Sequence, residues 1–159
     1  MKKLFATLLL LGLSFIFSTP AFCDQLIVPG ERIGPVFIGM RDDDMIRALG
    51  KPDQSPVTTA EGLQEFQFIR NHLLIVDVDP KTHTVKNIAT GHTTRYQTST
   101  GIKVGATQEF VELRMGKASV KQMPGDSISL NYVSSGIEFV IREKDKQKKV
   151  FVIIVKEKH

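Results

Sequence analysis

Residues 37–52 read FIGMRDDDMIRALGKP, and their spacing predicts a short helix. Met45 and Leu49 are four residues apart and therefore share one helical face. Gly50 follows as a left-handed C-cap, and Pro52 prevents the helix from resuming. A helix of about two turns is too short to be stable alone. It must therefore pack against other elements of the chain.

Three consecutive aspartates, Asp42, Asp43 and Asp44, open this helix, where they could bind a cation or stabilise the helix start. Consecutive helical residues point in different directions, so the three carboxylates do not converge on one ion. Calcium loops alternate their acidic residues and add further oxygen ligands, which this stretch lacks. Carboxylates in a first turn instead favour the helix by about 0.3–1 kcal/mol each, and Asp44 can pair with Arg47. We interpret the aspartates as structural and expect no metal site.

The same pattern recurs 66 residues later. Gly39 and Gly50 correspond to Gly105 and Gly116, which predicts a second helix with a second glycine cap. Thr107 supplies an ordinary N-cap for this second helix. The apolar positions that coincide are Met45 with Val111 and Leu49 with Met115. The chain is therefore interpreted as two copies of one unit, which together form one compact domain.

Three strand candidates follow the helix in each copy. They are 63–69, 73–79 and 84–90 in the first unit (24–92), and 127–133, 137–142 and 149–156 in the second unit (93–159). The Thr/Ser-rich residues 93–100 are interpreted as the crossing between the units. Residues 150–155 are apolar on both sides, which predicts a central strand. The predicted fold class is α+β: two tandem αβββ units form an antiparallel sheet, with both short helices packed on one face.

The helix stretch also resembles a known signature. Its pattern is similar to that of the small envelope modules typified by the outer-membrane assembly lipoprotein once called small protein A. The matching residues are Ile38, Gly39, Met40, Met45, Leu49, Gly50 and Pro52. The tandem units resemble the related β-lactamase-inhibitory-protein (BLIP) fold, so the resemblance implies a BLIP-like module. Two positions depart from the pattern, because Arg41 replaces the usual Ser/Thr cap and Ala118 stands where a second proline is expected.

The first 23 residues have the three parts of a secretory signal peptide. Lys2 and Lys3 precede the apolar run 4–17, and cleavage is expected between Cys23 and Asp24. The run is shorter than the 18 or more apolar residues that a membrane span needs, so we expect no transmembrane span after cleavage. The alternative is a lipoprotein modified on Cys23, but Pro20 and Phe22 do not suit that signal. The expected location is the periplasm or the medium.

Composition limits the function further. The mature chain would contain no cysteine, which excludes disulfide and thiol chemistry. Loss of Lys2 and Lys3 leaves 19 basic against 17 acidic side chains, so binding to nucleic acid is not indicated. The basic excess lies near the C-terminus, in Lys144, Lys146, Lys148 and Lys149. These lysines could bind an anionic ligand, or they could form a solvated turn that guards the apolar run 150–155, which we prefer.

No catalytic motif is recognisable. The sequence contains no Gly-x-Ser-x-Gly, no His-Glu-x-x-His and no phosphate-binding glycine loop. Its histidines are scattered: His72, His83, His92 and His159. Asp77 and Asp79 share one strand face and could act as paired carboxylates, but their position before Pro80 favours a solvated hairpin end. We therefore expect neither an enzyme nor a cofactor.

The predicted function is the binding of another envelope or secreted protein. Ile128, Leu130 and Tyr132 share one face of their strand, so its polar residues are expected on an exposed face that a partner could contact. Those residues are Ser127, Ser129 and Asn131, continued by Val133. The alternative is an anionic envelope ligand, a lipid headgroup or glycan, bound by the C-terminal lysines. An enzyme with an unrecognised site is the third interpretation.

Overall fold

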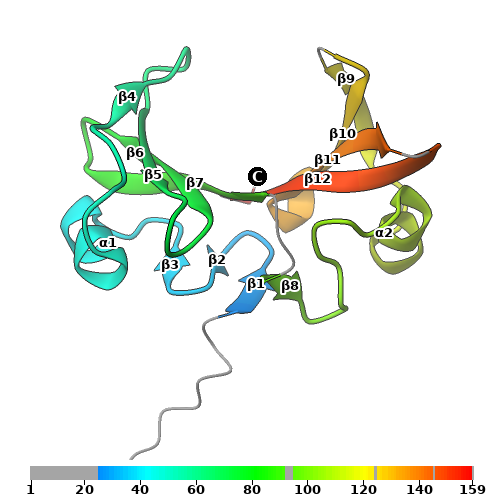
Figure 1. The fold of residues 1–159 in the computed structure, drawn as a ribbon, viewed down its shortest axis with the longest axis horizontal. Helices are drawn as coiled ribbons and strands as arrows, with labels where there is room; N and C mark the ends of the chain where they lie inside the picture. The colour runs from blue at the N-terminus through cyan, green and yellow to red at the C-terminus, as the bar shows by residue number, and fades with distance from the viewer. Residues whose placement is uncertain (1–24, 92–94, 124, 145, 159) are drawn as a thin grey trace, which may run out of the picture.

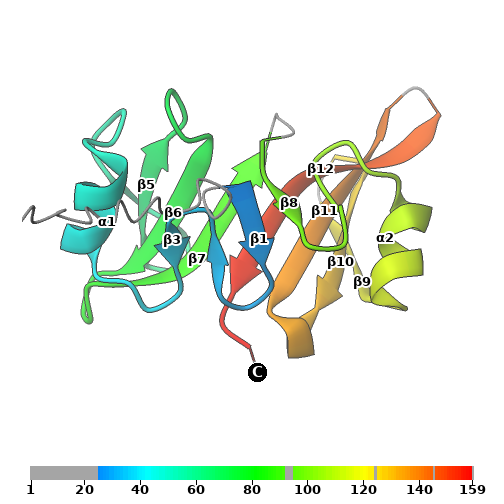
Figure 2. The same cartoon turned by 90° about the horizontal axis from the view of Figure 1, so that it is seen from below.

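The computed structural model describes residues 25–91, 95–123, 125–144 and 146–158, and it is an α+β protein with two sheets and two short helices (Figure 1, Figure 2). The large sheet has eight strands in the order β4-β5-β6-β7-β12-β11-β10-β9. All its neighbouring strands are antiparallel. Its strands are β4 (Val57–Thr58), β5 (Gln64–Phe68), β6 (Leu74–Asp79), β7 (Thr84–Gly91), β9 (Ser119–Met123), β10 (Ser127–Tyr132), β11 (Ile137–Lys144) and β12 (Gln147–Lys156).

The six predicted strands are confirmed, with ends that differ by at most two residues. β12 lies between β7 and β11, as its two apolar sides predicted. Two edge strands were not predicted. β4 has only two residues, and β9 is exposed along most of its length, so neither has the alternation that marks a strand with one buried face. Each half of the large sheet thus has four strands rather than three.

The two helices lie on the same side of the large sheet (Figure 1). They are α1 (Asp42–Leu49) and α2 (Gln108–Met115), and each buries one apolar side chain completely, Met45 in α1 and Val111 in α2. Gly50 and Gly116 end the helices with identical backbone angles, φ 82° and ψ −165°. The positive φ was predicted, but this ψ is not that of the left-handed helix. It lies in a region that only glycine adopts readily.

The backbone hydrogen bonds at the start of the two helices correspond, with a shift of 66 residues at the helix lead-ins and 65 at their strand partners. Gly39 N donates to Val85 O, and Gly105 N donates to Val150 O, both at 2.8 Å. The return bonds also correspond, because Val85 N donates to Met40 O and Val150 N donates to Ala106 O, again at 2.8 Å. Each helix lead-in is therefore fixed to the last strand of its own half.

A small sheet, which was not predicted, lies between the two helices (Figure 2). Its order is β3-β2-β1-β8, formed by β1 (Leu26–Val28), β2 (Arg32–Ile33), β3 (Val36–Phe37) and β8 (Gln97–Thr98). Strands of two or three residues are too short to show a period of two. Their apolar side chains nevertheless join the common core, where Ile27, Ile33 and Val36 are fully buried. β8 falls within the predicted crossing, of which residues 92–94 lie outside the described residues.

The other side of the large sheet, here called the free face, carries no helix in the described part of the chain. In Figure 1 the outer strands β4 and β9 rise away from the helices, while β7 and β12 lie lowest between them. The free face is therefore concave. None of the helices in the described ranges is long and apolar enough to cross a bilayer. The predicted signal peptide, with Cys23 and Asp24, lies outside the described residues.

Candidate functional site

Strand register determines which side chains meet on the free face. Side chains that are opposite one another on neighbouring strands form two rows on this face. The first row runs from β5 through β6 and β7 to β12. The second row lies two residues away on each of these strands and runs from β5 to β9. The first row is Glu65, Asp77, Asn87 and Lys156; the second is Gln67, Ile75, Ala89, Ile154, Glu138, Asn131 and Ser119. The face thus has an acidic side on β5 and β6, an apolar centre, and a side of mixed charge on β10 to β12.

The exposure predicted for the serines on this face is wrong. Ser127 and Ser129 are only 3% and 1% exposed. Longer side chains from neighbouring strands cover them: Ser129 Oγ donates to Glu138 Oε1 at 2.5 Å, and Ser127 Oγ accepts from Arg142 Nε at 3.4 Å. The predicted direction of these side chains was right, but a concave face buries small residues beneath long neighbours.

The other two residues of that predicted surface, Asn131 and Val133, are less deeply buried than the serines, and they differ from each other in exposure. Asn131 is half-buried, and its Oδ1 atom is buried with no hydrogen-bond partner in the described ranges. Val133 lies beyond β10 in a 3₁₀ turn and is 46% exposed. Of these four residues, Val133 alone is exposed among the described residues, and the unpaired oxygen of Asn131 is covered.

Glu138 is held as a carboxylate by the groups around it. It contacts Lys156 Nζ as well as Ser129 Oγ. Burial alone raises its pKa, but the hydrogen bonds from Lys156 and Ser129 and the charge of Lys156 together outweigh burial, so the pKa is lowered overall. This paired group already has partners and is poorly placed to bind a new one.

Asp77 is in the opposite situation. Its Oδ2 atom accepts from Asn87 Nδ2 at 3.1 Å, whereas its Oδ1 atom is buried and has no hydrogen-bond partner among the described residues. Burial is the main cause that raises the pKa of Asp77, and the charges of Glu65 and Glu61 raise it further. Asp79 differs, since it lies at the hairpin end and accepts from Lys81 N at 2.8 Å, as predicted for a solvated turn. The two aspartates therefore do not act as a pair.

Glu65 was not singled out from the sequence. It lies directly opposite Asp77 in the register of β5 and β6. Two carboxylates in such a position repel one another. The alternation in residues 64–68 could have placed Glu65 on the free face, but its partner strand is not determined by local sequence.

The apolar centre contains a small hollow of about 90 Å³. Its lining is Ile69, Leu73, Ile75, Ala89, Thr90, Gly91 and Val152. Leu73 adopts a φ of 58°, an unusual conformation for a bulky residue. Gly91 forms part of the floor, next to Val152 in the register of β7 and β12. The hollow is about the size of one aliphatic side chain.

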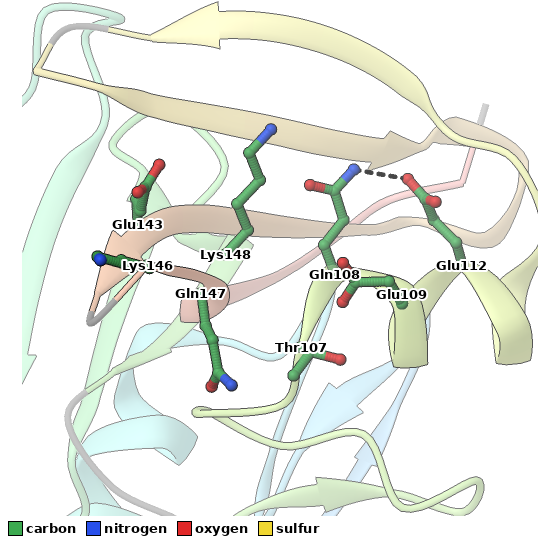
Figure 3. A pocket seen from close by; sticks show the side chains of 8 residues that line it. All are labelled: Thr107, Gln108, Glu109, Glu112, Glu143, Lys146, Gln147 and Lys148. Atoms are coloured by element: carbon green, nitrogen blue, oxygen red, sulfur yellow. Dashed lines mark hydrogen bonds between the residues drawn. The ribbon is translucent and has the colours of Figure 1, made fainter.

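A larger cavity of about 490 Å³ lies between the start of α2 and the β11–β12 hairpin (Figure 3). Its lining mixes three carboxylates with two ammonium groups: Glu109, Glu112, Glu143, Lys146 and Lys148, together with Thr107, Gln108 and Gln147. Gln108 Nε2 donates to Glu112 Oε1 at 2.8 Å, and Gln108 Oε1 is buried without a partner. The structure thus brings two of the four predicted lysines to a cavity whose other charges oppose an anion.

Lys149 does not line this cavity, and the side chain of Lys144 lies outside the described part of the structure. Lys149 is half-buried and forms a β-bridge with Thr107, the residue that caps α2. Lys144 ends β11, where it is opposite Gln147. The three lysines whose side chains the structure describes, Lys146, Lys148 and Lys149, therefore do not form one basic surface.

The aspartates at the start of α1 have structural contacts. The predicted pair is confirmed, because Arg47 Nη1 lies 2.6 Å from Asp44 Oδ1. Asp42 Oδ2 lies 2.8 Å from His83 Nδ1, which joins the helix to the β6–β7 turn. His72 Nε2 lies 3.0 Å from Leu49 O at the other end of α1. His92 and His159 lie outside the described residues.

Comparisons with known proteins show the fold alone. No family model matches the sequence. No curated protein matches it either. Among solved structures, an uncharacterized protein from Escherichia coli, YfeY, has a TM-score of 0.55 and 16% identity, and the match covers 84% of this chain and 97% of that one. A DUF4309 family protein from Bacillus subtilis, YjgB, has a TM-score of 0.56 and 21% identity, with 81% and 88% covered.

Proposed function

We propose that this chain is a periplasmic or secreted, non-enzymatic module that binds another envelope protein through the free face. The observation that supports the proposal is the contrast between the two faces of the large sheet. One face is covered by two helices and a small sheet, and the other is concave, is covered by none of the described helices or strands, and is apolar at its centre. Exposed apolar surface framed by polar groups is typical of protein-binding sites.

The same proposal extends to the architecture. We propose that the two halves are tandem BLIP-like units, each with its helix lead-in bonded to its own last strand. The corresponding hydrogen bonds of Gly39 and Gly105 support this interpretation. Pairing of β7 with β12 then joins the units into one sheet, which is wider than either unit could provide.

The C-terminal lysines support the alternative, an anionic ligand, less well. Lys146 and Lys148 share their cavity with Glu109, Glu112 and Glu143. Neighbouring carboxylates repel a polyanion. An anionic headgroup or glycan is therefore kept as an outcome of the test below.

Site-specific photocrosslinking tests the proposal in living cells. A photoreactive phenylalanine analogue at Ile154 lies at the centre of the free face, and the same analogue at Leu113, which is 79% exposed on α2, serves as the matched control. We expect a discrete protein adduct from position 154 and none of the same mass from position 113.

Salt then separates the two kinds of partner. A packed protein interface should survive the change from low to moderate salt, whereas binding to a polyanion should weaken steeply. Equal adducts from both positions, or binding only to lipid or glycan in a salt-sensitive manner, would contradict the proposal.

A further inference from the structure

Asp77 and the apolar hollow lie side by side on the free face. Ile75 lines the hollow, and Asp77 is two residues further along β6 on the same face. The neighbouring strand matches this arrangement, since Ala89 is opposite Ile75 and Asn87 is opposite Asp77. Two residues of a strand span about 7 Å. A ligand that fills the hollow can therefore also reach Asp77.

The charges beside the hollow favour a cation. Within the described part of the chain Asp77 Oδ1 is buried without a hydrogen-bond partner, and Glu65 lies directly opposite Asp77 on β5. The hydrogen-bond donor that the described structure gives Asp77 is the neutral amide of Asn87, which bonds to Oδ2. A lysine or arginine placed over the two carboxylates would relieve their repulsion through a charge-assisted hydrogen bond.

We propose that the free face binds a protein segment that places an aliphatic side chain in the hollow and a lysine or arginine between Asp77 and Glu65. This inference rests on the proposed function and specifies the chemistry of the partner. An extended segment satisfies it with residues i and i+2, whose side chains point to the same side about 7 Å apart. The aliphatic side chain supplies apolar burial, and the cation sets the register of the segment on the sheet.

Short peptides of defined sequence test the proposal. The probes are acetyl-Lys-Ala-Leu-amide and its reversed order, acetyl-Leu-Ala-Lys-amide, titrated to about 10 mM because short flexible ligands bind weakly. Amide chemical shifts of the ¹⁵N-labelled protein, purified in the form that cells accumulate, report the site. We expect at least one probe to shift the amides of Ile75, Asp77, Ala89 and Gly91.

Two altered peptides separate the two parts of the interaction. Acetyl-Glu-Ala-Leu-amide keeps the aliphatic group but reverses the charge, and acetyl-Lys-Ala-Asn-amide keeps the charge but removes the aliphatic group. We expect both to bind at least about fivefold more weakly than the better lysine–leucine probe. Equal binding of all four peptides, or shifts confined to the cavity beside α2, would overturn the proposal.

Two protein variants provide the reciprocal test. Asp77→Asn should weaken binding of the lysine–leucine probe about fivefold and leave the glutamate peptide no weaker. Ala89→Leu fills the hollow and should abolish the advantage of leucine over asparagine. The matched controls are Asp43→Asn and Ala48→Leu, which make the same changes at exposed positions of α1 and should leave binding unchanged.

The outcomes distinguish this inference from the function on which it rests. If photocrosslinking identifies a partner at Ile154 but the peptides show no preference for lysine with leucine, this inference fails and the proposed function stands. If position 154 gives no specific protein adduct, the proposed function fails, and the peptide shifts still decide whether the hollow and Asp77 recognise these two groups.

Discussion

At the scale of the residue, two glycines show how backbone geometry limits the sequence. Gly50 and Gly116 have the same φ and ψ, and a Cβ atom at either position would meet nothing within 4 Å. Any cost of substitution must therefore come from the backbone and not from a clash. The sequence predicted the need for glycine through the helix-end pattern, but ψ depends on where the chain goes next and could not be predicted.

We expect Gly50→Ala and Gly116→Ala each to lower the free energy of unfolding by about 1–3 kcal/mol, because their conformation is restricted to glycine. Urea denaturation measures the change. Asp43→Asn is the control, since it alters only an exposed charge in the first turn of α1 and should cost less than about 1 kcal/mol. A larger effect of Asp43→Asn than of the glycine substitutions would contradict the structural role of the aspartates.

Asp77 makes stability depend on pH in an unusual direction for an aspartate. Its pKa is raised above 3.8, first by burial and then by Glu65 and Glu61. The protonated form is thus favoured on folding, and stability is lost as the pH rises from 3.8 through the folded-state pKa. Asp77→Asn should remove this loss.

We expect Asp77→Asn to raise the free energy of unfolding at pH 7 by about 0.2–1 kcal/mol, as the like-charge pair with Glu65 is removed. The advantage should vanish well below pH 3.8, where wild-type Asp77 is protonated in both states. Urea titrations at several pH values measure it. A variant that is less stable than wild type at pH 7 would show that the carboxylate has a favourable partner. A more stable variant that binds peptides less well would identify Asp77 as a group kept for binding.

At the scale of the element, the small sheet is attached to the large sheet through a close approach of two turns. Gly30 N donates to Gly136 O at 3.0 Å, and Gly136 N donates to Val133 O at 3.0 Å. A Cβ atom at Gly136 would lie 2.4 Å from Lys156 O and 2.6 Å from Gly30 Cα. These are backbone atoms, which cannot move aside as the end of a flexible side chain can.

We therefore expect Gly136→Ala to lower the free energy of unfolding by about 2 kcal/mol or more, from backbone strain and overpacking combined. Gly62→Ala is the matched control, since Gly62 also has a positive φ but no atom within 4 Å of an added Cβ. It should cost only about 1 kcal/mol. Thermal unfolding of both variants compares them, and equal losses would mean that the contact between the turns does not contribute.

At the scale of the whole molecule, the sequence pattern within a segment predicted the secondary structure of that segment, but not its contacts with other segments. The helices and the six long strands follow from spacing, caps and alternation within single segments. The small sheet was missed because two- or three-residue strands have no measurable period. The burial of Ser129 was missed because Glu138, which accepts its hydrogen bond and is paired with Lys156, comes from another strand. The acidic pair of Asp77 and Glu65 likewise depends on register between strands, which the sequence of neither strand contains.

The junction between the two halves gives a prediction for the whole chain. Ile88 on β7 is opposite Val155 on β12, and both are fully buried in a core cluster that also contains Met45 and Val111 from the two helices. A shared core of this kind should unfold as one cooperative unit.

We expect Ile88→Ala to lower the free energy of unfolding by about 2–5 kcal/mol, the usual cost of a cavity in a packed core. Because both halves share the core, hydrogen exchange of the slowest amides in α1 and α2 should accelerate by the same factor. Val57 is 49% exposed on the edge strand β4. Val57→Ala is therefore the control, and it should change the free energy of unfolding by no more than about 0.5 kcal/mol. Faster exchange in α1 alone would show that the halves unfold separately, and that the pairing of β7 with β12 joins two independent units rather than completing a single domain.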